Sequence, residues 1–311
     1  MIRIDLITGF LGSGKTTFIK KYARCLMNKG LRIGILENDY GAVNVDVMLL
    51  GELEGENCLL ETVAGACDGD CRRRRFKTKL IALAMSGCER VIVEPSGIFD
   101  TDEFFDSLRE EPLDRWYETG SVICIADAGL DDSLSEEERF ILGSQCISAG
   151  TVLMSRTQLY STQQCAAAVG IIKQAAAELG GNAENMDFIL TPWDELTDED
   201  MERLSCCGRG SSDYVKKFRG SKEHSTLYFM HNGLDRSSAR ELADKLMHDR
   251  SCGSILRIKG FFCEDGQWYE LNASQSSVSC TKISQGQDII IVIGRELSKS
   301  RTERYFGRNT E

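Results

Sequence analysis

The 311-residue sequence is poor in proline, has no long apolar run and carries fewer basic than acidic side chains. Because it has only three prolines and no low-complexity tract, we expect no long disordered segment. No apolar run reaches the roughly 20 residues that a membrane-spanning helix needs. The formal net charge of −11 argues against nucleic acid or an anionic membrane as the main partner, because both repel an acidic surface.

Cysteine, by contrast, is abundant, with 13 residues. The sequence shows no recognisable signal peptide, since Met1 leads directly into an apolar, β-branched run. We therefore expect a cytoplasmic protein whose thiols are reduced, so that only clustered cysteines indicate chemistry. A hydrophobic content of 42% is enough for ordinary cores, and the length allows two domains.

The strongest local pattern is a glycine-rich loop between a predicted strand and a predicted helix. Residues 2–8 are apolar and β-branched, which favours a strand, and residues 17–28 have apolar side chains at helical spacing. The loop between them, Gly-Phe-Leu-Gly-Ser-Gly-Lys-Thr, fits the phosphate-binding pattern G-x-x-x-x-G-K-[ST]. The candidate nucleotide-binding residues are Gly9, Gly12, Ser13, Gly14, Lys15, Thr16 and Thr17.

Each part of this loop has a chemical reason. Glycines let the backbone wrap closely around phosphate oxygens, and the loop N–H groups and the helix N-terminus then face the anion. Lys15 places a positive charge on the β- and γ-phosphates, and Thr16 offers a hydroxyl to Mg²⁺. The alternative interpretation is a tight Gly-rich turn with a structural use only.

Two further predicted strands lead into acidic residues. The strand after the first helix is followed by a loop with Asp39 and Asp46, which is a candidate switch segment near Mg²⁺ or, alternatively, a solvated polar turn. The apolar strand 90–94 ends in Glu94, which we expect to hold Mg²⁺ through a water molecule. Gly97 would let its N–H approach the γ-phosphate. The predicted catalytic residues are Lys15, Glu94 and Asp39.

A pair of cysteines four residues apart, Cys67 and Cys71, forms the candidate thiol site. Thiolates suit Zn²⁺, Cu⁺ or iron, but a tetrahedral site needs four ligands. Water or one of four nearby side chains would supply the others, namely Cys58, Glu61, Asp68 and Asp70. The alternative is two reduced thiols without a metal. Cys206 and Cys207 are a second candidate pair, and the four arginines at 72–75 receive no role.

The order of predicted elements indicates the fold. Strands separated by helices over residues 1–196 predict an α/β fold, a doubly wound and mostly parallel P-loop NTPase sheet. We expect a linker with a short helix over 197–224 and a smaller C-terminal α+β domain over 225–311. There the pattern predicts one helix against several antiparallel strands, with a hairpin turn at 264–266. Because this domain has no recognisable catalytic group, we expect it to bind or regulate.

Six segments of the sequence carry a family resemblance. They are residues 8–17, 38–46, 94–97, 260–262, 268–272 and 293–297, and they span nearly the whole chain. Together they resemble the CobW-like branch of metal-trafficking P-loop GTPases, which is similar to the nickel-insertion GTPases of urease and hydrogenase maturation. The resemblance implies a Mg²⁺-dependent NTP hydrolase, with GTP as the expected nucleotide, that acts as a metallochaperone or as an activator of a metal or cobalamin-type cofactor enzyme.

The resemblance also implies a client metalloprotein as partner, zinc or another transition metal as cargo, and room for a nucleotide-dependent dimer. The alternative function is a nucleotide-dependent protein-interaction switch without metal transfer, which binds ATP or does not hydrolyse its nucleotide. This alternative keeps the whole phosphate loop and drops only the thiol site.

Two elements of the family pattern are altered in this sequence. The family's Cys-x-Cys-Cys element is echoed only by Cys67 and Cys71, and the chain has three histidines in total. The guanine-reading motif Asn-Lys-x-Asp corresponds to Ser155, Arg156, Thr157 and Gln158. An Asp carboxylate accepts two hydrogen bonds from guanine, whereas Gln158 offers one carbonyl oxygen and one donor group. GTP and ATP therefore both stay open, and we expect Arg156 to stack over the base.

Overall fold

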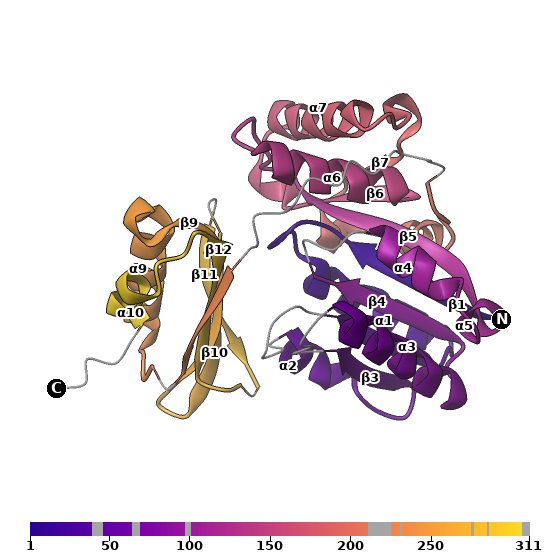
Figure 1. Cartoon of the computed structure of the whole chain (residues 1–311), viewed down its shortest axis with the longest axis horizontal. Coiled ribbons are helices and arrows are strands. Elements are labelled where there is room, and N and C mark those ends of the chain that lie inside the picture. Colours follow the sequence, from indigo (N-terminus) through magenta and orange to yellow (C-terminus); the bar gives the residue numbers. More distant parts are fainter. Residues whose placement is uncertain are drawn as a thin grey trace. The chain divides into compact units, whose positions relative to one another are not determined.

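The computed structural model of the chain describes residues 1–38, 46–63, 69–96, 101–210, 225–230, 232–274, 277–284 and 286–306. Two compact units divide the chain, Met1–Lys217 and Phe218–Glu311 (Figure 1). Within the described ranges, no helix is both long enough and apolar enough to cross a membrane. The predicted limits of 1–196, 197–224 and 225–311 stay a prediction.

The first unit is built on a seven-stranded parallel sheet with the strand order β3-β2-β4-β1-β5-β6-β7. The strands are β1 (Ile2–Thr8), β2 (Ile33–Asn38), β3 (Cys58–Val63), β4 (Arg90–Pro95), β5 (Tyr117–Asp127), β6 (Thr151–Ser155) and β7 (Phe188–Ile189). The chain moves to one side of β1 with β2 to β4 and to the other side with β5 to β7. A crevice beyond the carboxyl end of β1 is therefore the expected ligand site.

Helices cover both faces of this sheet (Figure 1), which confirms the predicted doubly wound architecture. On one face, α1 and α8 contribute Phe18, Tyr22 and Leu204 to the core. On the other face, α3 and α4 contribute Phe76 and Phe104, and α6 and α7 pack further along the same face. The helices of this unit are α1 (Lys15–Asn28), α2 (Asp46–Leu50), α3 (Gly69–Met85), α4 (Thr101–Leu108), α5 (Leu113–Trp116), α6 (Glu136–Ser148), α7 (Thr162–Glu178) and α8 (Asp198–Ser205).

A buried ionic cluster ties several of these elements together. The carboxylate of Asp5 on β1 is fully buried and accepts hydrogen bonds from Arg90 Nε (2.6 Å), Tyr22 Oη (2.8 Å) and the Ser121 N–H (2.7 Å). Arg90 also donates to the carbonyl oxygen of Ser205, at the end of α8. Burial and the neighbouring Asp5 carboxylate raise the pKa of Tyr22. The cluster therefore joins β1, β4, β5, α1 and α8.

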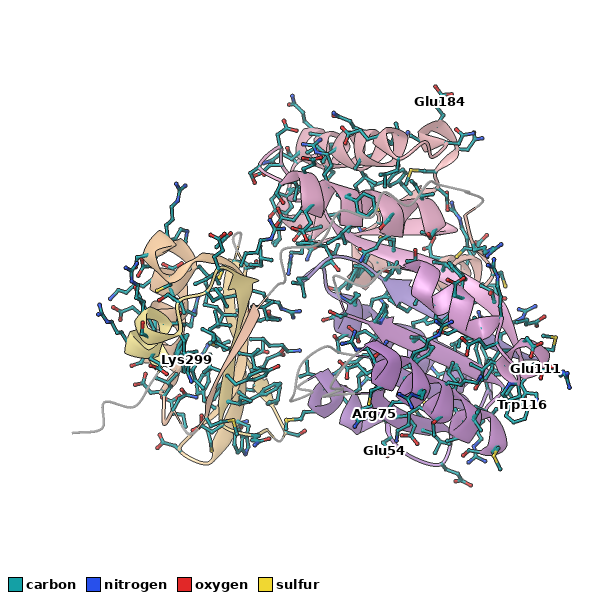
Figure 2. The ribbon with its side chains drawn as sticks, in the orientation of Figure 1. Glu54, Arg75, Glu111, Trp116, Glu184 and Lys299 are labelled. Carbon is teal, nitrogen blue, oxygen red and sulfur yellow. The ribbon has the colours of Figure 1, made fainter. Side chains whose placement is uncertain are left out.

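Parts of the first unit differ from the sequence-based expectation. Residues 58–63 form the edge strand β3, whereas the sequence analysis considered Cys58 only as a metal ligand. The sequence analysis also gave no helices between β4 and β5, where α4 and α5 occur. These short helices are held by tertiary packing of Phe104 and Leu113 against the sheet, which local propensity does not reveal. Charged side chains such as Glu54 and Glu111 point outward (Figure 2).

The second unit is a five-stranded antiparallel sheet with the order β11-β10-β9-β12-β8, in agreement with the predicted smaller α+β domain. A hairpin turn at Asp265 and Gly266, both with positive φ, joins β9 to β10. α9 and α10 pack on one face of the sheet (Figure 1), around Leu246, Phe262 and Phe306. The elements are β8 (Ser225–Met230), α9 (Arg236–His248), β9 (Ser254–Glu264), β10 (Gln267–Ser274), β11 (Ser277–Ile283), β12 (Ile289–Arg295) and α10 (Lys299–Phe306).

Candidate nucleotide-binding site

The candidate site lies at the carboxyl edge of the parallel sheet. The glycine-rich loop follows β1, Glu94 is the penultimate residue of β4, and Asp127 and Ser155 end β5 and β6. These strands are neighbours in the order β4-β1-β5-β6, so residues far apart in the sequence meet at one edge. This edge, on both sides of β1, is where open α/β sheets bind their ligands.

The backbone of the loop requires glycine at two positions. Gly9 has a φ of 142°, and a Cβ there would collide with the carbonyl oxygen of Ile125 on β5. Gly14 has a φ of 104°, and a Cβ there would lie 3.0 Å from the ring of Trp193. No side chain caps α1 at Gly14, and the N-terminus of this 14-residue helix favours an anion.

Lys15 lies across the loop rather than in solvent. Its Nζ donates to the carbonyl oxygen of Gly9 at 3.0 Å, and only 6% of the residue is exposed. The ammonium group is thereby held above the start of α1, where phosphate oxygens would meet both the positive charge and the helix N-terminus. This is the position that the sequence pattern predicts for a phosphate-binding lysine.

Thr16 and Glu94, predicted separately as Mg²⁺ groups, contact each other directly. The Thr16 hydroxyl donates to Glu94 Oε1 at 2.8 Å, and both residues are buried. They come from α1 and β4, which are 78 residues apart in the sequence. The structure thus brings a hydroxyl and a carboxylate together beside the phosphate loop.

A second acidic group belongs to the same corner, and the sequence pattern alone did not single it out. Glu37, near the end of β2, is only 2% exposed and lies directly opposite Glu94 in the strand register. Glu37 is two residues after Ile35, and Glu94 is two residues after Ile92. Both isoleucines pack on the α1 side, so both carboxylate side chains point towards α1. The signal was available, because Glu37 ends an apolar strand exactly as Glu94 does.

The donor set of this corner fits Mg²⁺. Hydroxyl and carboxylate oxygens are the hard ligands that Mg²⁺ prefers, and Thr16, Glu37 and Glu94 supply both kinds. Two buried carboxylates on adjacent strands repel each other, and their burial is costly without nearby positive charge. Lys15 and a bound divalent cation are two sources of such charge at this edge of the sheet.

The segment after β6 is tied to the phosphate loop through Arg156. Its φ is 58°, an unusual conformation for a residue with a side chain. One guanidinium nitrogen, Nη2, donates to the carbonyl oxygen of Gly12 at 2.8 Å, and Nη1 forms an ion pair with Asp127 at the end of β5. The guanidinium is therefore fixed by two partners, and the predicted stacking of Arg156 over a base stays a prediction.

Trp193 provides a second tie between this side of the sheet and the phosphate loop. It follows β7 at the start of a short 3₁₀ helix, and its Nε1 donates to the carbonyl oxygen of Met154 on β6 at 2.9 Å. Its ring packs edge-on against Phe18 of α1, with the ring centroids 5.8 Å apart, and borders Gly14. The loops after β6 and β7 therefore lie together, next to the start of α1.

The predicted thiol site is only partly described by the structure. Cys71 is half-buried in the first turns of α3. Cys58 begins β3, so the length of that strand, roughly 17 Å, separates it from the sheet edge where α3 starts. Burial, with a contribution from nearby Cys88, raises the pKa of Cys58 to about 11. The idea that Cys58 completes a metal site with Cys71 is therefore wrong.

The remaining predicted residues are placed as follows. Asp39, Cys67, Asp68 and Gly97 lie outside the described residues, and Asp46 begins α2. Cys206 is exposed at the end of α8, whereas Cys207 is half-buried against the carbonyl oxygen of Val122, and burial raises its pKa. Over the part of the chain that the structure describes, no three His, Cys, Asp or Glu side chains form a group that could hold a metal ion.

The fold and the glycine-rich loop define a P-loop nucleotide-binding protein. Comparison with known families agrees: the model of the CobW/HypB/UreG nucleotide-binding domain matches residues 3–184. The chain belongs to this family, which confirms the resemblance seen in the sequence. By class it is a P-loop GTPase of the CobW family.

The individual curated relatives match this chain at 30% identity or less. The zinc chaperone YeiR of Escherichia coli K12 is 30% identical over 143 residues, which are 45% of this chain and 42% of YeiR. The zinc chaperone YjiA of the same organism is 28% identical over 167 residues, 51% of this chain and 50% of YjiA. The chain thus spans half or less of the curated relatives it matches. A crystal structure of Zn(II)-bound YjiA GTPase aligns over 98% of both chains at 17% identity, with a TM-score of 0.40.

Proposed function

We propose that this chain is a Mg²⁺-dependent GTP hydrolase whose nucleotide state controls the binding and release of a transition metal, zinc in the first instance, for a client protein. The observation that carries the proposal is the meeting of Lys15, Thr16 and Glu94 beside the glycine-rich loop. Family membership supports GTP as the nucleotide, and the two zinc-chaperone relatives support zinc as the metal.

The chain's own residues account for the phosphate chemistry. Lys15 and the N–H groups at the start of α1 bind the phosphate oxygens and stabilise the negative charge that develops as the γ-phosphoryl group leaves. Thr16, Glu37 and Glu94 would hold Mg²⁺, which when bound supplies neutralising charge at the phosphates. Because these groups are buried and fixed by neighbouring strands, they need little reorganisation during the reaction.

The strand order supports a coupling between nucleotide and metal. β3, β2 and β4 are adjacent parallel strands, so β2 and β3 end at the same sheet edge as Glu94, and residues 39–45 and 64–68 follow these two strands in the sequence. Asp39 lies in the first of these segments and Cys67 in the second, and Cys71 follows in α3. A change at the γ-phosphate would then reset both segments, so that hydrolysis becomes the signal for metal transfer.

Lysine replacement tests the hydrolysis. In Lys15→Ala, multiple-turnover phosphate release from Mg²⁺–GTP should fall at least about 100-fold, because the charge at the phosphates is lost. Lys20→Ala is the matched control, since Lys20 lies on the same helix and forms a surface ion pair with Glu52 at 3.1 Å. Undiminished turnover in Lys15→Ala would overturn the proposal.

Cysteine replacement tests the metal. The double variant Cys67→Ser/Cys71→Ser should weaken Zn²⁺ binding, and in the unaltered protein Zn²⁺ affinity should differ between the GTP and GDP forms. Cys263→Ser is the control, because Cys263 is an exposed thiol in the other unit. If the double variant binds Zn²⁺ as the control does, metal transfer through these thiols is excluded, and the interaction switch without metal becomes the better account.

A further inference from the structure

The base-reading side of the site is identified by its place relative to the phosphate loop. Residues 155–158 follow β6 and the loop with Trp193 follows β7, both on the side of β1 away from Glu94. Arg156 and Trp193 join these segments to Gly12 and Gly14 of the phosphate loop. A nucleotide with its phosphates in that loop and its Mg²⁺ at Glu94 therefore presents its base to these two segments.

Within residues 155–158, one side chain is available to read the edge of a base. Ser155 and Thr157 are buried, and Arg156 is committed to Asp127 and to the carbonyl oxygen of Gly12. Gln158 is exposed in the 3₁₀ helix Thr157–Leu159, and its amide makes no hydrogen bond within the described part of the chain. Its carboxamide is therefore exposed, with its acceptor and its donor unused within the described residues.

We infer that Gln158 shifts the base preference of this site from guanine towards 2-oxopurines, so that xanthosine triphosphate is bound more tightly than GTP. The inference rests on the proposed function for its triphosphate chemistry but not for its metal handling. It assigns to Gln158 a specificity role that follows from hydrogen-bond matching alone.

The matching is direct. A carboxamide places a C=O acceptor beside an NH₂ donor. Xanthine presents an N1–H donor beside a 2-oxo acceptor, so it satisfies both groups of Gln158. Guanine presents two adjacent donors, N1–H and the 2-amino group, so one of them meets the amide NH₂ donor to donor. Hypoxanthine offers only N1–H and forms one hydrogen bond without a clash, and it should bind between the other two.

Asp127 and Asp194 are the two carboxylates to consider as guanine acceptors in place of Gln158. Asp127 is engaged by Arg156 and by the N–H of Gly129 at 2.9 Å. Asp194, the exposed residue after Trp193, is the competing carboxylate on the neighbouring loop. If Asp194 read the base, Asp194→Asn and not a change at Gln158 would alter the guanine preference, so this variant separates the two possibilities.

The experiment is an equilibrium titration of the full chain with the Mg²⁺ complexes of XTP, ITP, GTP and ATP. The unaltered protein should bind XTP about tenfold more tightly than GTP, because one neutral hydrogen bond is gained and one donor–donor contact is removed. Gln158→Asp should reverse the order, with GTP about tenfold tighter and XTP about tenfold weaker than in the unaltered protein. Gln163→Asp is the matched control, since it adds the same charge at an exposed position on α7.

The outcomes are separable. A preference for GTP over XTP in the unaltered protein, or a ratio that Gln158→Asp leaves unchanged, overturns the inference, and so does a change caused by Asp194→Asn alone. Gln158→Glu serves as a second variant if Gln158→Asp does not fold. If one of these results overturns the inference, phosphate release from GTP that depends on Lys15 would still leave the proposed function intact. Failure to bind any of the four nucleotides would overturn the proposed function and the inference together.

Discussion

Replacing Asp5 by asparagine should destabilise the first unit far more than a change of one atom suggests. The carboxylate accepts four hydrogen bonds, two from Arg90, one from Tyr22 and one from the Ser121 N–H. An asparagine of the same shape keeps one acceptor oxygen, but it turns an NH₂ group towards these donors. It also removes the negative charge that compensates the buried Arg90 guanidinium.

The magnitude follows from burial. Asp5 is 0% exposed and Arg90 is 6% exposed, so water cannot replace the lost partner. Removing one member of a buried ion pair costs roughly 3–5 kcal/mol. In a unit of this size each kcal/mol lowers the melting temperature by about 2–4 °C, so we expect a decrease of roughly 6–20 °C.

Urea unfolding of the full chain, followed by circular dichroism, measures this free energy. Arg3 and Glu118 provide the control, because they form an exposed ion pair at 3.6 Å between the same strands β1 and β5. Glu118→Gln should cost no more than about 1 kcal/mol. If Asp5→Asn lowers the free energy of unfolding as little as Glu118→Gln does, the reasoning is refuted. Asp5→Leu combined with Arg90→Met should recover stability, since no charge is then left unpaired.

Three further predictions concern the site and the second unit. Glu94→Gln should lower phosphate release about 100-fold and raise the Mg²⁺ concentration needed for half-maximal rate, with exposed Glu89→Gln as control. Arg156→Met should weaken GTP and XTP equally, about tenfold in a binding titration, because the tie to the phosphate loop is lost for every base. Hydrogen bonds from Ser251 and Tyr305 lower the pKa of Asp249 to about 2. An unfolded Asp carboxyl has a pKa of about 4, so the stabilisation that ionised Asp249 gives to the folded second unit is fully present above that pH and is lost as the pH falls towards 2. Asp249→Asn should therefore flatten the dependence of this unit's melting temperature on pH between those two values.

The phosphate side of the site was predictable because its information is local. Eight consecutive residues, Gly9 to Thr16, contain the positive-φ positions, the lysine and the Mg²⁺ hydroxyl, and the flanking strand and helix have clear periodicity. Glu94 was predictable for a related reason, since parallel strands end at one edge and a carboxylate at the end of an apolar run lies there. The sheet and the family followed from the same pattern.

The rest of the site depends on contacts that no local pattern encodes. Trp193 borders Gly14 across 179 positions because β7 lies beside β6, and the sequence pattern of β7 does not reveal which strand is its neighbour. The guanidinium of Arg156 contacts Asp127 and the carbonyl oxygen of Gly12, and these partners are set by the β5–β6 pairing. The Asp5 cluster was missed because a buried charge in a strand gives no signal until its partner strand is known.

Cys58 shows how a residue pattern misleads when strand direction is ignored. Cys58 precedes Cys71 by 13 residues, and this spacing suggested that both bind one metal ion. However, Cys58 begins β3, so the length of this edge strand separates Cys58 from the carboxyl edge of the sheet. Burial also keeps the Cys58 thiol protonated at neutral pH, with a pKa of about 11. β3 ends at the same sheet edge as β2 and Glu37, and Cys67 and Cys71 follow β3 in the sequence, so these two remain the thiols to test.

The strand order makes the two functions of the site separable. Glu37 and Glu94 lie on the β2–β4 side of the phosphate loop, whereas Gln158 and Trp193 lie on the β6–β7 side, and β1 stands between them. Because β1 separates the two sides, the free energies of changes on opposite sides should add. Gln158→Asp should therefore change the XTP-to-GTP ratio by the same factor in the presence and absence of Glu94→Gln. A factor that depends on Glu94 would mean that the base segment and the Mg²⁺ corner are coupled through the phosphate loop, with Arg156 on Gly12 as the contact that carries the coupling.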